Sequence, residues 1–406
     1  MVQYGDTMPK IALINPPSSF LIDDKVFPPL GILYISAYLK KYGYYPEIID
    51  LAGNKKLPNI DADIIGISAV TPQYPEALKI LHELKNRGTN AIFVIGGPHA
   101  TCSPETAKDF DISVIGEGEN AMLNIAMRYP TTFPKYFKYP PPNLYMLPFP
   151  DRKNIDIHNY KYFIDDEPTT TMLTSRGCPY NCAFCSSIYN RVRLHSADYV
   201  INEIKEIQKL NFSGIMFFDD IFILNKKRLF KICEYLKKEK IVWRCFVRAD
   251  LVNDEIMKIM AKSGCKEIGI GVETGSQKIL DIVNKGTTVE QNTKTIELAR
   301  NYGILSKAFI IVGLPSESKE TIAETEQFLK KTKPDDLDIT IYVPYPNTPI
   351  VNNPNRYDIK FDKTDLKKAW FKGIPGQYHS LVSTSNLPSY EIVEARDKIE
   401  KKFKEW

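Results

Sequence analysis

The sequence predicts an α/β protein with an N-terminal doubly wound parallel sheet, a partial (β/α)6 barrel after it, and a small C-terminal helical region. Three observations support this fold class. Short apolar runs alternate with helical segments along most of the chain. These runs are continuously apolar, as expected for parallel strands that are buried on both faces. A stretch dense in proline and aromatic residues, 129–150, separates one βα series from the next.

The first series contains five expected strands separated by helical segments. The strands are Ile11–Asn15, Glu47–Asp50, Asp63–Ser68, Ile92–Gly96 and Ile112–Ile115. Helical spacing of apolar residues covers Leu30–Tyr42 and Glu76–Arg87, and each segment is followed by a glycine, Gly43 or Gly88. Glycine at this position ends a helix because it adopts the left-handed conformation at little cost.

Small and polar residues follow the strands of this first series. Ligands of doubly wound sheets bind at the carboxyl ends of the strands, where glycine allows close approach to the backbone. Taken singly, each of these loops also fits an ordinary turn. The candidate ligand-binding residues are Pro16, Ser68, Thr71, Gly96, Gly97, Gly116, Glu117 and Gly118.

The second series contains six βα units, which predict the partial barrel. The expected strands are Thr169–Thr174, Ile215–Asp219, Val242–Val247, Glu267–Val272, Ser306–Val312 and Asp338–Val343. Helices are expected after the N-caps Ser196 and Asn225, from Asn253 to a stop at Gly264, and after the fourth strand up to Tyr302.

Chemically competent residues stand at the end of each of the first five strands of this series. The groups are the cysteine loop 176–185, Asp219–Asp220, Arg248–Asp250, Gly271–Glu273 and Gly313–Pro315. Each group alone could be a helix cap or a surface charge. Because catalytic groups of such barrels lie at the carboxyl ends of the strands, we expect all five groups to face one mouth.

The cysteine loop, Arg176–Cys185, carries Cys178, Cys182 and Cys185 within eight residues. Soft thiolates select iron–sulfur clusters or zinc. A structural zinc site usually draws four ligands from separated pairs, and the next histidine, His195, lies outside the usual spacing. Disulfides or unconnected core cysteines are further alternatives. We favour a 4Fe-4S cluster, in which three ligands leave one iron open to bind and reduce a small molecule.

With an aromatic residue, Phe184, before its last cysteine, this loop resembles the cluster loop of the radical S-adenosylmethionine (SAM) superfamily. The resemblance implies that Cys178, Cys182 and Cys185 ligate the cluster and that SAM is cleaved there to a 5′-deoxyadenosyl radical. It also implies a SAM site. The expected SAM-binding residues are Asp219 or Asp220 for the amino group, Arg248 for the carboxylate, Glu273 for the ribose, and Phe184, Gly313 and Pro315 for the adenine.

The loops of the first series, with Pro28–Gly31 before the first helix, resemble the cobalamin-binding domain that precedes the barrel in class B radical SAM enzymes. Many cobalamin domains place a cobalt-ligating histidine after the second strand, but Asp50–Asn54 contains none. Cobalamin-dependent radical SAM enzymes commonly lack it too. His99 is a weaker candidate because the loop match explains it without cobalt. A vestigial or substrate-docking domain of the same fold is the alternative.

The expected domains are 1–128 (cobalamin-binding), 129–165 (linker), 166–349 (barrel) and 350–406 (C-terminal cap). The cap contains aromatic residues, among them Trp370 and Phe371, and a closing helix from Ser389. It could close over the substrate or cover the open side of the barrel.

Composition excludes several classes of function. The chain has 406 residues, 43% of them hydrophobic, and a net charge of +4, which argues against a nucleic-acid platform. We find no apolar run of bilayer length and no signal-peptide core, so we expect a cytoplasmic protein without membrane contact. The resemblance implies a small-molecule or peptide substrate and an electron donor such as flavodoxin or ferredoxin.

The activity implied by the resemblance is cobalamin-dependent methyl transfer to an unactivated carbon. Cobalamin-assisted rearrangement or cyclisation is the alternative among enzymes, and a non-catalytic cobalamin or metal sensor is the alternative from another class. A methylthiotransferase is disfavoured, because it would carry three further cysteines in its first domain, where only Cys102 is present. No catalytic side chain beyond the cofactor ligands is assigned.

Overall fold

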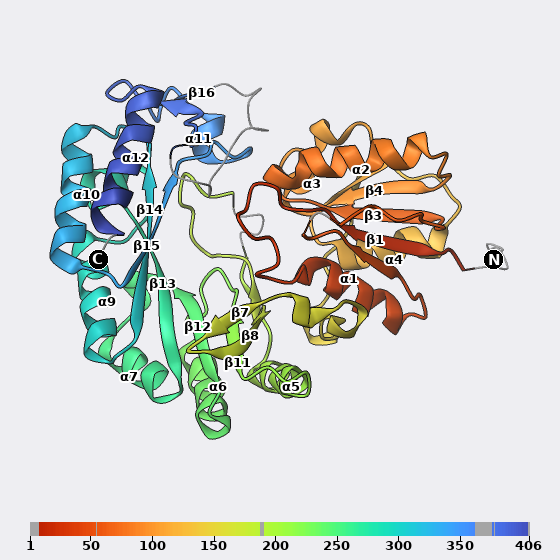
Figure 1. The fold of residues 1–406 in the computed structure, drawn as a ribbon, viewed down its shortest axis with the longest axis horizontal. Coiled ribbons are helices and arrows are strands. Elements are labelled where there is room, and N and C mark those ends of the chain that lie inside the picture. The colour runs from red at the N-terminus through yellow and green to blue at the C-terminus, as the bar shows by residue number, and fades with distance from the viewer. Residues whose placement is uncertain (1–7, 54, 187–190, 362–375, 377, 405–406) are drawn as a thin grey trace. The chain divides into compact units, whose positions relative to one another are not determined.

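The computed structural model describes residues 8–53, 55–186, 191–361, 376 and 378–404 (Figure 1). Trp370 and Phe371 of the expected cap lie outside these described residues. The chain divides into two compact units, Met1–Lys161 and Tyr162–Trp406, and each is described by itself. None of the described helices is both long enough and apolar enough to cross a membrane.

The first unit is built on a parallel sheet with the strand order β2-β1-β3-β4-β5-β6. The strands are β1 (Ile11–Asn15), β2 (Glu47–Asp50), β3 (Ile64–Ser68), β4 (Ile92–Gly96), β5 (Ile112–Ile115) and β6 (Tyr136–Lys138). The first five are the predicted strands, whereas β6 lies inside the stretch expected to be a linker and pairs with β5. The strand order changes direction between β1 and β3, which is where doubly wound sheets bind ligands.

Helices cover both faces of this sheet, as Figure 1 shows. They are α1 (Leu30–Lys41), α2 (Tyr74–Asn86), α3 (Pro98–Cys102) and α4 (Gly118–Arg128). Helices α1 and α4 pack together on one face, while α2 and α3 lie over the other. Helices α1 and α2 end next to the predicted glycines, since Gly43 and Gly88 have φ angles of +87° and +78°, the left-handed conformation that ends a helix.

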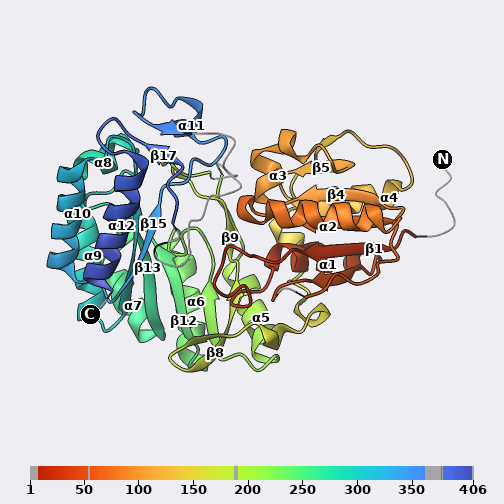
Figure 2. The same cartoon turned by 45° about the horizontal axis from the view of Figure 1, so that its top comes forward.

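The second unit contains a sheet with the order β15-β14-β13-β12-β11-β8-β7. The strands are β7 (Tyr162–Ile164), β8 (Glu167–Met172), β11 (Gly214–Phe217), β12 (Val242–Val247), β13 (Cys265–Glu273), β14 (Leu305–Val312) and β15 (Asp336–Ile341). The six strands from β8 to β15 are parallel, and β7 adds an antiparallel hairpin at the β8 edge. The sheet curls without closing, which confirms the predicted partial (β/α)6 barrel (Figure 2).

Most helices of this unit cover the outside of the curled sheet. They are α5 (Ala197–Gln208), α6 (Lys226–Glu239), α7 (Asp254–Lys262), α9 (Val289–Asn301), α10 (Lys319–Thr332) and α12 (Ser389–Phe403). Two short helices follow the ends of β13 and β15, namely α8 (Gln277–Ile282) and α11 (Pro349–Asn352). The side chains of Ser196, Asn225 and Asn253 cap α5, α6 and α7 as the sequence predicts. The helix expected up to Tyr302 is instead two helices, α8 and α9, separated by the segment Val283–Thr288.

The inner face of the barrel is arranged in layers that end at the site. Deepest is the ion pair between Arg244 and Glu267, 2.8 Å apart. Two residues further along the strands, a Cβ on Gly269 would lie 2.6 Å from the Phe246 ring and 2.7 Å from the Phe309 ring. Glycine is therefore needed for these two rings to fill the interior. Above this layer the strands end, and the polar residues of the site begin.

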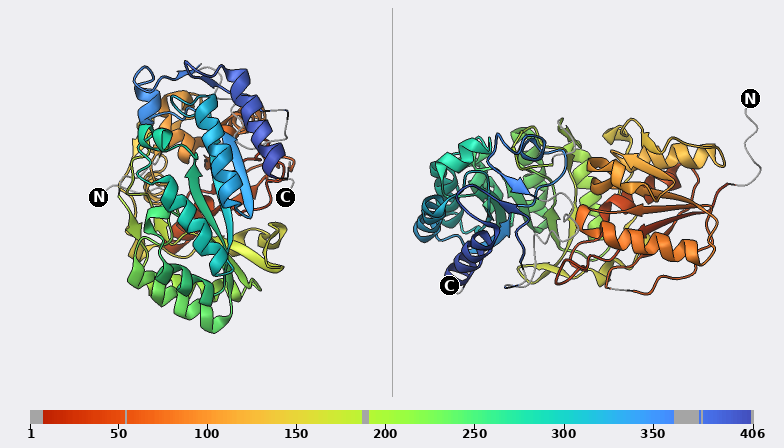
Figure 3. Two further views of the ribbon diagram at one scale, coloured as in Figure 1. Left: turned by 90° about the vertical axis from the view of Figure 1, so that its left-hand side faces the viewer. Right: turned by 90° about the horizontal axis from the view of Figure 1, so that it is seen from above.

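The C-terminal helix α12 completes the unit at the β15 edge, where it runs beside α10 (Figure 3, left). Its Arg396 is 1% exposed, donates to the Ile339 carbonyl at 3.2 Å and stacks over the Tyr378 ring at 3.7 Å. The described part of the C-terminal region therefore covers the side of the barrel, which is one of the two roles expected for it.

Candidate active site

The cysteine loop is fixed at its base and along its length. Ser175–Arg176 (β9) pairs antiparallel with Arg193–Leu194 (β10), which holds together the two ends of the segment that carries the thiols. None of the three cysteines forms a disulfide; Cys178 and Cys182 are partly buried and Cys185 is exposed. The loop thus presents thiols at the end of β8, as the sequence predicts.

Asp219 ties the start of this loop to the neighbouring strand. Its carboxylate is 1% exposed and accepts from the Thr174 N–H at 2.6 Å, from the Ser175 hydroxyl at 2.7 Å and from the Thr174 hydroxyl. Burial raises the pKa of Asp219, and the Thr174 and Ser175 hydrogen bonds oppose that rise. Since these bonds occupy Asp219, its exposed neighbour Asp220 is the carboxylate that is better placed to meet a ligand.

The segment Val283–Gly286 is hydrogen-bonded to the middle of the cysteine loop. The Ala183 N–H donates to the Val283 carbonyl at 2.8 Å, and the Asn284 side-chain amide donates to the Asn181 carbonyl at 3.0 Å. This segment is the break between α8 and α9, with φ angles of +52° at Asn284 and +68° at Gly286. The interruption of the expected helix therefore builds the site.

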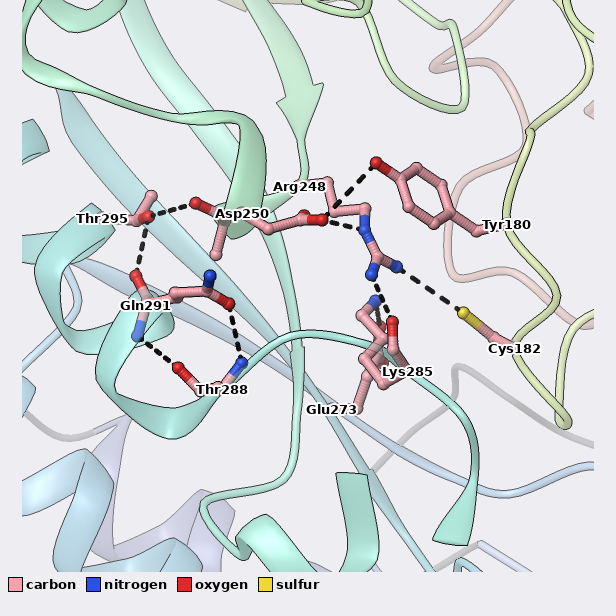
Figure 4. Close-up of polar contacts among 10 residues, drawn as sticks. Tyr180, Cys182, Arg248, Asp250, Glu273, Lys285, Thr288, Gln291 and Thr295 are labelled. Carbon is pink, nitrogen blue, oxygen red and sulfur yellow. Dashed lines mark hydrogen bonds and ion pairs between the residues drawn. The ribbon is translucent and has the colours of Figure 1, made fainter. Parts of the chain in front are cut away.

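Arg248, at the end of β12, contacts this loop and the residues around it (Figure 4). Its guanidinium lies 3.6 Å from the centre of the Tyr180 ring. Its Nη1 lies 3.9 Å from the Cys182 sulfur, its Nε lies 2.8 Å from an Asp250 oxygen, and its Nη2 donates to the Lys285 carbonyl. The residue predicted to bind SAM thus lies at the cysteine loop, with all three nitrogens directed at protein groups.

Glu273, at the end of β13, forms an ion pair with Lys285 at 2.5 Å (Figure 4). Glu273 has a φ of +65°, next to a register shift between β13 and β14. A Cβ on Gly271 would lie 2.6 Å from the Glu273 carboxylate and 2.8 Å from the Lys285 ammonium, so glycine leaves the space for this pair. The ammonium is also 5.9 Å from the centre of the Phe184 ring, which brings Phe184 and Glu273 to one place.

Sequence reasoning missed Lys285. It stands alone in a loop, in no motif and in no periodic pattern, so its type and spacing carried no signal. The sequence Asn284-Lys285-Gly286 could have suggested a turn within the expected helix, but it could not have identified Glu273 as the partner of Lys285.

The loop after β14, Gly313–Pro315, is shaped from beneath by Glu317, which the sequence analysis also missed. The Gly313 N–H donates to the Glu317 carboxylate at 2.5 Å, and Gly313 has a φ of +89°. Glu317 is 1% exposed, and burial raises its pKa to about 8. The tail covers this loop, since a Cβ on Gly313 would lie 3.0 Å from Ile392 of α12.

Charged candidate residues lie close enough to the Cys178 thiol to affect its pKa. The pKa of the Cys178 thiol is raised mainly by burial and also by the nearby Asp220 and Cys182, whereas Arg248 lowers it. Among the described residues, no three His, Cys, Asp or Glu side chains gather around one point as the ligands of a single ion would. A four-iron cluster takes each thiolate at a separate corner and does not require such a point. The donor set therefore fits the cluster.

In the first unit, the predicted ligand-binding residues follow the ends of adjacent parallel strands. Gly97 shows how closely these loops approach each other: it has a φ of +91°, and a Cβ there would lie 2.9 Å from both the Ala69 carbonyl and the Ser68 hydroxyl. Gly118 starts α4, and a Cβ on it would lie 2.6 Å from Ile35. The carboxyl edge of β3, β4 and β5 is thus kept free of side chains at these positions, which suits a large planar ligand.

His99 lies beneath this edge and is fully engaged by protein. Its ring stacks on Tyr74 with 4.0 Å between centroids, and its two nitrogens lie 3.4 Å from the Thr71 hydroxyl and 2.8 Å from the Thr106 hydroxyl. Burial lowers the pKa of His99 to about 4, so the ring is neutral at ordinary pH. These contacts account for His99 without a metal. At the end of β2, where many cobalamin domains begin the segment with the cobalt-ligating histidine, the Asp50 carboxylate accepts from the side chains of Asn15 and Tyr160, each at 2.9 Å.

Two family models match the chain. The model described as the radical SAM superfamily covers residues 172–329, and the model described as the B12 binding domain covers residues 24–126. These ranges lie within the second and the first unit, respectively. The two matches agree with the two resemblances found in the sequence.

Curated relatives extend over most of the chain. The uncharacterized methyltransferase PH0819 of Pyrococcus horikoshii is 32% identical over 376 residues, which cover 84% of this chain and 82% of that protein. The anaerobic magnesium-protoporphyrin IX monomethyl ester cyclase of Rubrivivax gelatinosus is 29% identical over 361 residues, which cover 79% of this chain and 65% of the cyclase.

Among solved structures, the radical S-adenosylmethionine methyltransferase TsrM of Kitasatospora setae, with cobalamin and a 4Fe-4S cluster bound, superimposes with a TM-score of 0.68. The match covers 88% of this chain and 78% of TsrM at 14% sequence identity. At that identity the similarity establishes the shared fold of both units.

Proposed function

The chain belongs to the cobalamin-binding radical SAM family, whose enzymes use a 4Fe-4S cluster, SAM and cobalamin, and from this membership we propose that it methylates an unactivated carbon of a small-molecule substrate. The observation that supports this most strongly is the cysteine loop, held at the mouth of the barrel together with Asp220, Arg248 and the Glu273–Lys285 pair. A 32% identical relative is named as a methyltransferase, which supports methyl transfer as the reaction.

Cys178, Cys182 and Cys185 are the proposed ligands of the cluster, which supplies the electron that cleaves SAM. The other residues around the loop hold and shield it. Asp219 fixes the start of the loop, and Val283–Gly286 fixes its middle. Their task is to keep the three thiols in place while the fourth corner of the cluster stays open to SAM.

We assign the parts of SAM to individual side chains. Asp220 accepts from the amino group, and Glu273 accepts from the ribose hydroxyls. Phe184 and the backbone of Gly313–Pro315 bind the adenine. The sequence assigned the SAM carboxylate to Arg248, but its nitrogens are directed at Asp250, Cys182 and Lys285.

Lys285 is the better candidate for the SAM carboxylate. Its ammonium is nearly buried, contacts the proposed ribose-binding carboxylate Glu273 at 2.5 Å and lies near the Phe184 ring. A charge-assisted hydrogen bond at such a site is stronger than one in water. Lys285 thus joins the site as a residue that the sequence did not suggest.

Cobalamin supplies the methyl carrier when it is bound, and we propose that it binds along the carboxyl edge of the first sheet. The proposed contacts are Pro16, Ser68, Thr71, Gly96, Gly97, Gly116, Glu117 and Gly118. Backbone and hydroxyl groups dominate this set, so it holds the ligand by shape and hydrogen bonds. No histidine follows β2, and the ring of His99 is bonded to Thr71 and Thr106, so we assign no protein ligand to the cobalt.

We propose that the electron comes from a separate protein, a flavodoxin or a ferredoxin. Cys233, Cys245 and Cys265 lie near one another but are buried in the core, and burial raises the pKa of the Cys265 thiol. We also propose a reducing, cytoplasmic setting for an enzyme with an open iron site.

Cyclisation is the second candidate, because a 29% identical relative is named as a cyclase. Both reactions begin with the same cleavage of SAM, so the test must follow the methyl group. The reconstituted enzyme would be incubated anaerobically with reductant, hydroxocobalamin, candidate substrates and SAM that carries a deuterated methyl group. Methyl transfer predicts 5′-deoxyadenosine together with a product heavier by one labelled methyl.

A product without the label would overturn methyl transfer and favour cyclisation. The control is Cys182→Ala, which should yield neither 5′-deoxyadenosine nor product. A wild-type enzyme with an intact cluster that yields neither would contradict the catalytic assignment.

A further inference from the structure

The Arg248 guanidinium contacts two residues of the cysteine loop, Tyr180 and Cys182, and two residues beside it, Asp250 and Lys285. We propose that Arg248 is a positioning residue of the iron–sulfur cluster. It folds the cysteine loop before the cluster arrives, and it stabilises negative charge on the cluster through the Cys182 sulfur. This inference rests on the proposed cluster ligands but not on the reaction that the enzyme catalyses.

The guanidinium uses each of its nitrogens and one of its faces. Nε pairs with Asp250 at 2.8 Å, Nη1 points at the Cys182 sulfur at 3.9 Å, and Nη2 donates to the Lys285 carbonyl. The Tyr180 ring covers one face at 3.6 Å. With only 5% of the residue exposed, little of the group is left for a further ligand.

These contacts join three parts of the chain that are far apart in sequence. Tyr180 and Cys182 belong to the cysteine loop, Asp250 follows β12, and Lys285 belongs to the segment that grips Ala183 and Asn181 (Figure 4). The Tyr180 hydroxyl also lies 3.5 Å from Asp250, which closes a ring of contacts around the guanidinium. Because these contacts form between protein groups, we expect the loop to hold its shape before the cluster is inserted.

The same contacts bear on the reduction of the cluster. Reduction adds an electron to thiolate-bound iron, so a nearby positive charge and an N–H directed at a ligand sulfur favour the reduced form. Arginine keeps its charge at all accessible pH values, and burial keeps solvent from screening it. Arg248 should therefore raise the reduction potential of the cluster and ease its reduction by a protein donor.

The test compares Arg248→Gln and Arg248→Lys with Arg244→Gln. Arg244 is a matched control: it lies four residues before Arg248, on β12, is also buried, and pairs with Glu267 and Tyr162 rather than with the cysteine loop. Three readouts apply. The first is hydrogen exchange of the 176–186 amides in protein without cluster, the second is the iron bound per chain after reconstitution, and the third is the cluster potential from an EPR-monitored titration without SAM.

In Arg248→Gln we expect faster loop exchange, less iron bound per chain and a more negative potential, while Arg244→Gln matches the wild type in all three. Arg248→Lys keeps the positive charge but loses the planar guanidinium with its several N–H donors. Its cysteine loop should therefore exchange faster than in the wild type, with a smaller shift in cluster potential than in Arg248→Gln. If Arg248→Gln instead keeps wild-type exchange and potential and only weakens SAM binding, Arg248 is a SAM ligand and the proposal is wrong.

Tyr180 supplies a second pair of variants if Arg248→Gln does not fold. Tyr180→Phe keeps the ring over the guanidinium and should behave like the wild type in exchange, whereas Tyr180→Leu should loosen the loop. Equal exchange in these two variants would overturn the proposal. A wild-type enzyme that holds its cluster but makes no 5′-deoxyadenosine would contradict the proposed reaction. The comparison of loop exchange and cluster potential among the variants would still test the role of Arg248.

Discussion

Lys285 is the residue that we propose for the SAM carboxylate, so its replacement tests the proposed SAM site directly. Replacing it with methionine keeps most of its volume but removes the charge that faces Glu273 and the proposed carboxylate. Hydrogen bonds to charged groups contribute about 1.5–3 kcal/mol, so Lys285→Met should weaken SAM binding by roughly 10- to 150-fold. Equilibrium dialysis on the reconstituted enzyme measures the affinity. Lys278→Met, at an exposed lysine of α8, is the control. Equal affinities in the two variants would remove Lys285 from the site.

Glu317 should give the protein a specific dependence of stability on pH. Burial raises its folded-state pKa from 4.5 to about 8. Between these values the native state holds a proton that the unfolded state has lost, so stability falls as pH rises. The contribution is fully present below pH 4.5 and is lost as pH passes 8. Glu317→Gln should therefore lose less stability than the wild type between pH 6 and pH 9, as urea unfolding would measure. Parallel curves for the two proteins would contradict this assignment.

At the scale of residues, the sequence predicts site candidates that carry a motif or stand at a strand end. The three cysteines, Asp220 and Glu273 are candidates of this kind, and the structure brings them together because strand ends of a parallel barrel converge. Lys285 and Glu317 were not predicted, because their contacts come from partners that only the tertiary fold brings near. Arg248 was predicted from its position, yet its partners could not be read from the sequence.

At the scale of elements, the loop after β4 should decide cobalamin binding. Gly97→Ala introduces a Cβ that would lie 2.9 Å from the Ala69 carbonyl, in a backbone conformation (φ +91°, ψ −172°) that essentially only glycine adopts. We expect loss of retained cobalamin after desalting, with cluster content and 5′-deoxyadenosine formation preserved. The control is Gly88→Ala, which also has a positive φ, +78°, but has open space around its Cβ and so introduces no clash. Cobalamin loss in both variants would point to general destabilisation.

The boundaries of most elements were predictable because apolar runs and helix caps are local signals. The five strands of the first series and the N-caps Ser196 and Asn225 are examples. The strand β6 was missed because three residues in a proline-rich stretch show no periodicity. The break between α8 and α9 was missed because a continuous helical pattern hid Val283–Thr288, which the fold uses to hold the cysteine loop.

At the scale of the whole molecule, two compact units with separate ligands predict two unfolding transitions. Each unit has its own buried core, as independently folding domains do. Hydroxocobalamin should raise one transition, since a ligand at 100 times its dissociation constant stabilises by about 2.7 kcal/mol. Reconstitution of the cluster should raise the other. Calorimetry with and without each cofactor measures both shifts, and hydrogen exchange assigns them to residues. A single transition that both cofactors move together would contradict independent units.

The way in which the cysteine loop is held has a consequence for synthesis on the ribosome. The partners that fix the loop come later in the chain: Arg248 lies 66 residues after Cys182, and Asn284 lies 103 residues after Asn181. Ile350, whose N–H donates to the Ala183 carbonyl at 3.3 Å, comes later still, 167 residues after Ala183. At 5–20 residues per second, the thiols are exposed for roughly 8–33 s before Ile350 has been made. During that interval they can react with oxidants or stray metals, so iron is best inserted after these later segments have folded around the loop.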